Sequence, residues 1–197
     1  LPPKKYLLPP CETLLTYQTD TGYQGPSSTI QPVILMGLHP CDLAGINYLD
    51  RLFLGESTDP LYAARRNALT LIGTSCEPDD LCSCHLGPSP LKAGFDLFLQ
   101  LVEGGFAVTG ASLRGNELLE LLAEILEERD PAVPDDTRRF FGQSIEPAPR
   151  SVLDPALPDW QELAGHCLGC GACSICCPTC SCFDVLECGG LDGSSAE

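Results

Sequence analysis

The chain has 197 residues, of which 44% are hydrophobic and 19% are charged. This length and composition exclude a large multidomain enzyme and a wholly disordered chain, and they allow one well-filled domain with a small appendage. The formal net charge of −16 argues against binding of nucleic acid, because polyanions are bound by basic surfaces.

The first half of the chain predicts two strands, each joined to a helix. Residues 1–32 are rich in Pro, Gly, Ser and Thr, which indicates an extended arm with a short helical patch at residues 12–17. The apolar run at residues 33–38 predicts a strand covered on both faces, and helical spacing begins at Asp42. A helix is expected again over residues 61–66, followed by a second buried strand over residues 68–73.

The second half predicts a hairpin, a helix and a linker. Residues 95–102 and 106–111 flank a Glu-Gly-Gly turn signal, and the apolar spacing within residues 118–126 predicts an amphipathic helix that packs in the core. Prolines recur between 130 and 159, with a short helix expected at residues 138–141. We predict an α/β fold, with a small mixed or parallel sheet and flanking helices in residues 1–130, a proline-rich linker at 131–159, and a C-terminal ferredoxin-like iron–sulfur segment at 160–197.

Cysteines are the strongest functional signal. The chain contains 13 of them, eight within residues 167–188, and the odd count beside an α/β core favours metal binding over a disulfide framework. Four follow the spacing C-x2-C-x2-C-x3-C-P that binds [4Fe–4S] clusters in bacterial ferredoxins, namely Cys167, Cys170, Cys173 and Cys177. Gly169 and Gly171 allow the backbone to turn around such a cluster, and Pro178 ends the loop.

The remaining cysteines near this run leave alternatives open. Zinc also binds C-x2-C pairs, although structural zinc sites normally use two separated pairs rather than a consecutive triple before Cys-Pro. Cys180 and Cys182 predict either a second metal site or the fourth ligand of the first cluster. Cys176 is interpreted as a small buried side chain, and Cys11 and Cys188 are assigned to no site.

A second set of cysteines follows the two predicted strands. Because the carboxyl ends of neighbouring parallel strands meet at one edge of a sheet, this set predicts a second cluster site there. The expected ligands are Cys41, Cys76, Cys82 and Cys84, with Asp42 and His85 in reserve. The alternative is that Cys41 is a small buried residue, while Cys82 and Cys84 lie in a disordered or disulfide-forming loop.

Other candidate residues carry weaker signals. His39 and His166 are interpreted as hydrogen-bonded side chains rather than ligands, and Arg65 with Arg66 as a solvated pair. Nucleotide-binding loops and hydrolase motifs are absent from the sequence. We therefore assign no catalytic residue.

These residues resemble the iron–sulfur beta subunit of cytoplasmic sulfhydrogenases and hydrogenases, a family of 4Fe-4S dicluster proteins shared with the corresponding iron–sulfur component of anaerobic sulfite reductase. The matching stretches are residues 6–15, 39–43, 59–66, 76–84, 94–97 and 167–183. The resemblance implies several [4Fe–4S] clusters that relay electrons between a flavoprotein subunit that binds NAD(P)H and the catalytic subunit. The family pattern continues to a second ferredoxin run that this sequence lacks. The C-terminal segment is therefore expected to be truncated, or the chain to be a shortened variant that completes one ferredoxin-type cluster with Cys180 or Cys182. In ferredoxins Cys177 would serve that second cluster, which leaves the fourth ligand of the first open.

Three functions are open at this level. The favoured one is an electron-transfer component of a cytoplasmic oxidoreductase complex, serving a hydrogenase or a sulfur or sulfite reductase. The others are a cluster-based reductase of disulfides or sulfur with an open coordination position, and a zinc-stabilised adaptor. We expect no nucleic-acid partner and no membrane insertion, and we expect acidic surroundings to lower the potential of a bound cluster.

Overall fold

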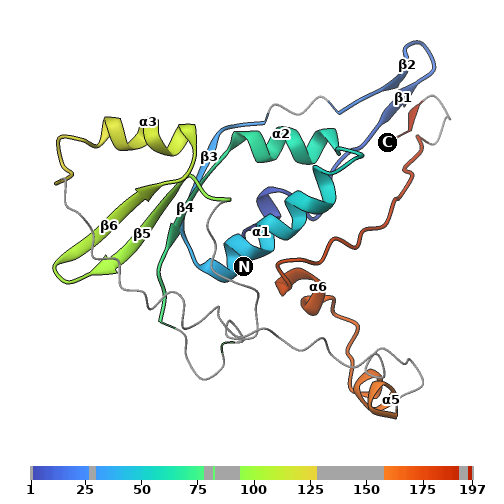
Figure 1. The fold of residues 1–197 in the computed structure, drawn as a ribbon. Helices are drawn as coiled ribbons and strands as arrows, with labels where there is room; N and C mark the ends of the chain where they lie inside the picture. The colour runs from blue at the N-terminus through green and yellow to red at the C-terminus, as the bar shows by residue number, and fades with distance from the viewer. Residues whose placement is uncertain are drawn as a thin grey trace.

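The computed structural model describes residues 2–26, 30–77, 82, 94–127, 158–190 and 195–196. It is a mixed α/β structure with a small mixed sheet, flanking helices and a cysteine-rich C-terminal segment, as the sequence predicted (Figure 1). The described residues do not include Cys84, His85, the expected helix at 138–141 or residues 131–157 of the expected linker. The predicted domain boundaries therefore stay predictions.

A four-stranded sheet forms the centre of the molecule. Its strands are β3 (Val33–Leu38), β4 (Leu69–Thr74), β5 (Leu97–Val102) and β6 (Gly105–Gly110), in the order β3-β4-β5-β6. The β3–β4 and β4–β5 pairs are parallel, and β5 and β6 form the predicted antiparallel hairpin. Gly104 at the hairpin turn has a φ of 85°, which favours glycine. The parallel pairing of β3 with β4 is the feature that positions the first candidate site.

Three helices pack against this sheet. Helix α1 (Pro40–Phe53) contacts β3 and β4, α2 (Pro60–Ala68) contacts β4, and α3 (Leu113–Leu121) contacts β6 (Figure 1). Asp59 begins α2 by accepting a hydrogen bond of 2.8 Å from the backbone N–H of Tyr62, with Pro60 in the first turn. Ser112 begins α3 in the same way, accepting from Gly115 N–H at 2.9 Å. Short polar caps thus determine where both helices start.

The core lies where α1 and α2 meet the sheet and the N-terminal arm. Its residues come from the arm, from β3 and β4, from the inner faces of the helices and from the segment before β5: Leu7, Leu35, Leu38, Leu43, Ile46, Leu49, Tyr62, Leu69, Leu71 and Phe95. The arm begins with a short 3-10 helix, η1 (Pro3–Tyr6), which contacts α1. Leu7 follows η1 and is fully buried, so the arm is part of the core rather than a loose extension.

Two predictions about burial are wrong. Strand β4 is buried as predicted, but β3 is an edge strand whose alternate residues Ile34 and Met36 are 61% and 71% exposed. The amphipathic helix predicted at residues 118–126 begins at Leu113 and ends at Leu121, which is exposed; Ile125 lies beyond the end of the helix and is exposed as well. In both cases the apolar pattern identified the element, but no described part of the chain covers the outer face.

The N-terminal arm also differs from its prediction. Residues 12–17 are not helical, because Glu12 forms an ion pair with Arg65 of α2 and the chain then enters a strand. Strands β1 (Thr16–Gln18) and β2 (Gly22–Gln24) form a hairpin to which β7 (Ser195–Ala196) adds. Arg66 likewise pairs with Asp50 at 3.0 Å, so the interpretation of Arg65 and Arg66 as a solvated pair is wrong. Both arginines tie helices and arm together.

The C-terminal segment contains α5 (Pro158–Gly165) and α6 (Ala172–Cys176). The ribbon then passes α1 and runs up to the N-terminal hairpin, where β7 pairs with β1 (Figure 1). Within the described residues, none of the helices is long and apolar enough for a bilayer-crossing segment.

Candidate metal centres

The first candidate site lies at the carboxyl-end edge of the parallel strands. Cys41 is in the first turn of α1, directly after β3, and Cys76 follows β4 by two residues. Since β3 and β4 are parallel neighbours, both chains leave the sheet at the same edge, as predicted. Cys41 is exposed, which contradicts the alternative that it is a small buried residue, and Cys76 and Cys82 are half-buried. Cys84 lies outside the described residues.

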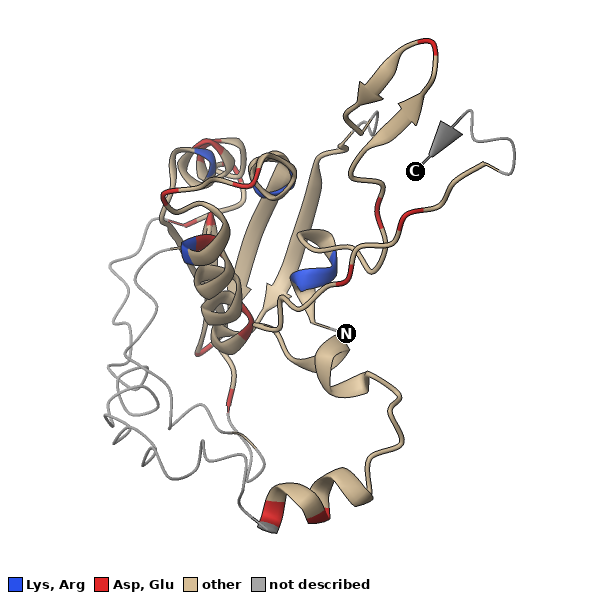
Figure 2. Cartoon of the chain, turned by 90° about the vertical axis from the view of Figure 1, so that its right-hand side faces the viewer, with Lys and Arg blue, Asp and Glu red and all other residues tan. Residues whose placement is uncertain are grey.

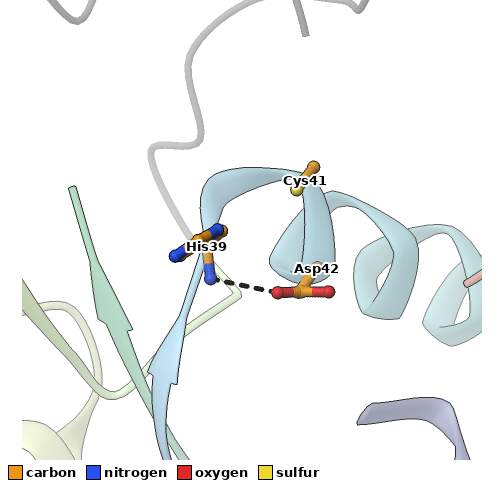
Figure 3. Close-up of side chains that lie close together, drawn as sticks. All are labelled: His39, Cys41 and Asp42. Carbon is orange, nitrogen blue, oxygen red and sulfur yellow. Dashed lines mark hydrogen bonds between the residues drawn. The ribbon is translucent and has the colours of Figure 1, made fainter. Parts of the chain in front are cut away.

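His39 and Asp42 join Cys41 at this edge. One ligand atom from each of the three side chains lies within 4.8 Å of the other two, and the three surround the turn from β3 into α1 (Figure 3). The backbone N–H of His39 donates a hydrogen bond of 3.1 Å to Asp42 Oδ2, which helps to begin α1. Asp42 was predicted as a reserve ligand, but His39 was not. The His-x-Cys-Asp spacing between a strand and a helix is the sequence signal that identifies it.

The second candidate site is the C-terminal cysteine run. All eight cysteines from Cys167 to Cys188 have free thiols, and Cys176 is exposed, so its interpretation as a buried side chain is wrong. Gly169 and Gly171 have φ values of 65° and 70°, the left-handed conformation that the predicted loop needs. The backbone N–H of Gly169 donates to Cys167 Sγ at 3.4 Å. Among the described residues, the thiols of this run do not lie close enough together to form a three-ligand group like that of His39, Cys41 and Asp42.

Cys177 and Cys180 occupy a different environment from the earlier cysteines of the run. Residues 177–181 are half-buried, whereas Cys167, Cys170 and Cys173 are exposed. A hydrogen bond with the Thr179 hydroxyl, 3.3 Å from Cys177 Sγ, lowers the pKa of the Cys177 thiol. The backbone N–H of Cys182 is the main cause that lowers the pKa of the Cys180 thiol. The surroundings of both Cys177 and Cys180 therefore favour the thiolate, which is the form that binds metal.

The C-terminal run packs against the α/β domain at two points. A Cβ added at Gly45 of α1 would lie 2.8 Å from Pro178 Cβ, so these two residues are in close contact. Lys4 of η1 donates hydrogen bonds to the backbone carbonyls of Ser174 and, at 3.0 Å, of Cys180. These contacts explain why burial begins at Cys177.

The donor set fits an iron–sulfur centre in its chemistry. Free thiols at ferredoxin spacing, left-handed glycines between them, and amide or hydroxyl groups next to sulfur are the features by which proteins hold such clusters and tune them. The sheet-edge group, which consists of His39, Cys41 and Asp42, differs from the C-terminal run. It offers one imidazole, one thiol and one carboxylate from the turn between β3 and α1. The cysteine-rich C-terminal run is consistent with bound iron–sulfur clusters.

Comparison with known proteins supports this interpretation. The chain is 34% identical over 203 aligned positions to the sulfhydrogenase 2 subunit beta of Pyrococcus furiosus, with 95% of the chain covered. The chain is a relative of that hydrogenase beta subunit. It spans 59% of the relative's length. No protein-family model and no solved structure matches the sequence. The predicted relation to a hydrogenase beta subunit is thereby confirmed, while the link to anaerobic sulfite reductase stays a prediction.

Proposed function

We propose that this relative of a hydrogenase beta subunit is an iron–sulfur electron-transfer subunit. It passes electrons between a flavoprotein subunit that binds NAD(P)H and the catalytic subunit of a hydrogenase or of a sulfur or sulfite reductase. A subunit named beta belongs to a multi-subunit assembly, which supports partner subunits for this chain as well. The cysteine-rich composition supports a redox role that requires no substrate pocket.

The observation that carries the proposal is the contact between Gly45 and Pro178. Cys41 lies four residues before Gly45 in α1, so the two share a helix face and are about 6 Å apart along the helix axis. Pro178 directly follows Cys177 in the C-terminal run. The contact therefore supports a short separation between the two candidate cysteine sets. Short separation is what electron transfer between two centres requires.

Each site has its own candidate ligands. Cys167, Cys170 and Cys173 hold a [4Fe–4S] cluster in the C-terminal segment, with the further thiolate drawn from Cys177, Cys180 and Cys182. A second cluster is held by Cys41, Cys76, Cys82 and Cys84, with His39 and Asp42 as neighbours in the first turn of α1. Bound clusters supply one-electron transfer, and the protein adjusts their potentials through hydrogen bonds to sulfur and local charge.

Electron paramagnetic resonance of the full chain tests the proposal. The protein is reconstituted anaerobically with iron and sulfide and then reduced with dithionite. We expect two paramagnetic signals of reduced clusters, broadened by magnetic interaction because the two sites are adjacent. The Cys41→Ser variant should lose one signal and the broadening of the other. A folded, reconstituted chain without any cluster signal would overturn the proposal.

A zinc-stabilised adaptor is the competing function. The sheet-edge group favours it, because imidazole, thiolate and carboxylate are all zinc ligands. An adaptor would bind zinc, lack sulfide and show no reduction by dithionite. Zinc in place of iron, in protein purified without oxygen, would favour this function over electron transfer.

A further inference from the structure

Lys4 joins the two ends of the chain at the candidate cluster site. Its ammonium group donates to the carbonyl of Ser174, and to that of Cys180 at 3.0 Å. These two carbonyls lie on either side of Cys177 along the sequence, and Ser174 directly follows Cys173. A single side chain from η1 therefore reaches across the cysteine run.

The backbone of Lys4 is fixed by the core. Its carbonyl accepts hydrogen bonds from the N–H groups of Leu7 and Leu8 at 2.9 Å and 2.7 Å. Leu7 is fully buried, and Pro3, next to Lys4, is buried as well. The ammonium group is thus held on a rigid support, which distinguishes it from a mobile surface lysine.

The C-terminal segment contains no lysine or arginine of its own. Residues 151–197 contain seven acidic residues and neither lysine nor arginine. The described part of this segment carries red but no blue in Figure 2. Lys4 brings a positive charge to it from the other end of the chain.

We propose that Lys4 is a positioning residue that clamps the C-terminal run onto the α/β domain and raises the reduction potential of the cluster held there. This inference rests on the proposed function. A reduced cluster carries one more negative charge than an oxidised one, so a nearby ammonium group stabilises the reduced form. Lys4 thereby offsets the acidic surroundings, which on their own would lower the potential.

Redox titration of the reconstituted full chain tests the electrostatic part. In Lys4→Met, the midpoint potential of the C-terminal cluster should become more negative, while Lys4→Arg keeps a potential close to that of the wild type. Lys5→Met is the matched control. It removes one positive charge from the adjacent residue, which is exposed and lies over the Tyr6 ring at 5.0 Å. An iron-loaded Lys4→Met protein with the wild-type potential would overturn this role.

Hydrogen exchange of the metal-free full chain tests the clamp. Backbone amides within residues 172–182 should exchange faster in Lys4→Met than in the wild type or Lys5→Met, with core amides of β4 unchanged. Equal exchange in all three proteins would overturn the clamp. Failure of the proposed function gives a different result, namely a wild-type chain that takes up no iron, and that result would also end the role of Lys4 in setting the potential.

Discussion

Asp96 shows how one side chain connects three parts of the fold. It is 9% exposed, and its carboxylate accepts hydrogen bonds from the Leu71 backbone N–H at 2.8 Å and from the Ser112 hydroxyl at 2.6 Å. Asp96→Ala leaves a buried N–H of β4 without its acceptor and removes a charged hydrogen bond. We expect the free energy of unfolding to fall by about 3 kcal/mol in urea titration. Asp20→Ala, at an exposed turn, is the control, and equal stability of both variants would contradict the account.

Cys170 and Cys176 form a matched pair for the ligand assignment. Both are exposed and they lie six positions apart, but only Cys170 has the ferredoxin spacing. Cys170→Ser should lower the iron bound by the reconstituted chain by about half, because one of two clusters loses a ligand. Cys176→Ser should bind as much iron as the wild type. The reverse order would show that the spacing has been assigned to the wrong thiols.

Single residues were the hardest feature to predict from the sequence. The ferredoxin spacing made Cys167, Cys170 and Cys173 candidate ligands without any structure, because these residues are close along the chain. His39 was interpreted as a hydrogen-bonded side chain, and its grouping with Cys41 and Asp42 depends on the turn from β3 into α1. Lys4 was beyond prediction, since its contacts are with Ser174 and Cys180 at the far end of the chain.

Elements were predicted better than their surroundings. The apolar runs gave β3 and β4, and the order of strand and helix gave their parallel pairing, so the shared edge of Cys41 and Cys76 was predictable. Whether an apolar face is covered depends on tertiary packing, which explains the errors over β3 and residues 118–126. The helix expected at residues 12–17 failed for the same reason, because Arg65 holds Glu12 in an extended arm.

Helix α1 serves as the docking surface for the C-terminal run at Gly45. In an isolated helix, Gly→Ala stabilises by up to about 1 kcal/mol. Here the new Cβ would lie 2.8 Å from Pro178 Cβ, and we expect Gly45→Ala to displace the run. Proteolysis within residues 172–182 of the metal-free chain should become faster. Gly165→Ala in α5, where a Cβ meets no atom within 4 Å, is the control, and unchanged cleavage of Gly45→Ala would contradict the docking.

The N-terminal arm is anchored by Leu7. Because this side chain is fully buried against the core, Leu7→Ala should lower the free energy of unfolding by about 3 kcal/mol through lost burial and the cavity left behind. Leu14→Ala, at a residue that is 42% exposed, should cost far less. Urea titration of both variants decides whether the arm belongs to the folded core. Equal effects would place the arm outside it.

The N-terminal and C-terminal parts of the chain are in contact. Lys4 and Gly45 hold the cysteine run, and β7 near the C-terminus pairs with β1 of the N-terminal hairpin. The molecule is therefore organised so that the cysteine-rich segment, distant in sequence, returns to the edge of the α/β domain. This return brings Pro178, which follows Cys177, against α1 four residues beyond Cys41, a contact that neither half of the sequence specifies alone.

Metal and sulfide analysis of the full chain, purified without oxygen, distinguishes an iron–sulfur protein from a zinc protein. The proposed electron-transfer function predicts iron and acid-labile sulfide in similar amounts, with a brown colour that dithionite bleaches. Zinc without iron or sulfide in a correctly folded chain would contradict it.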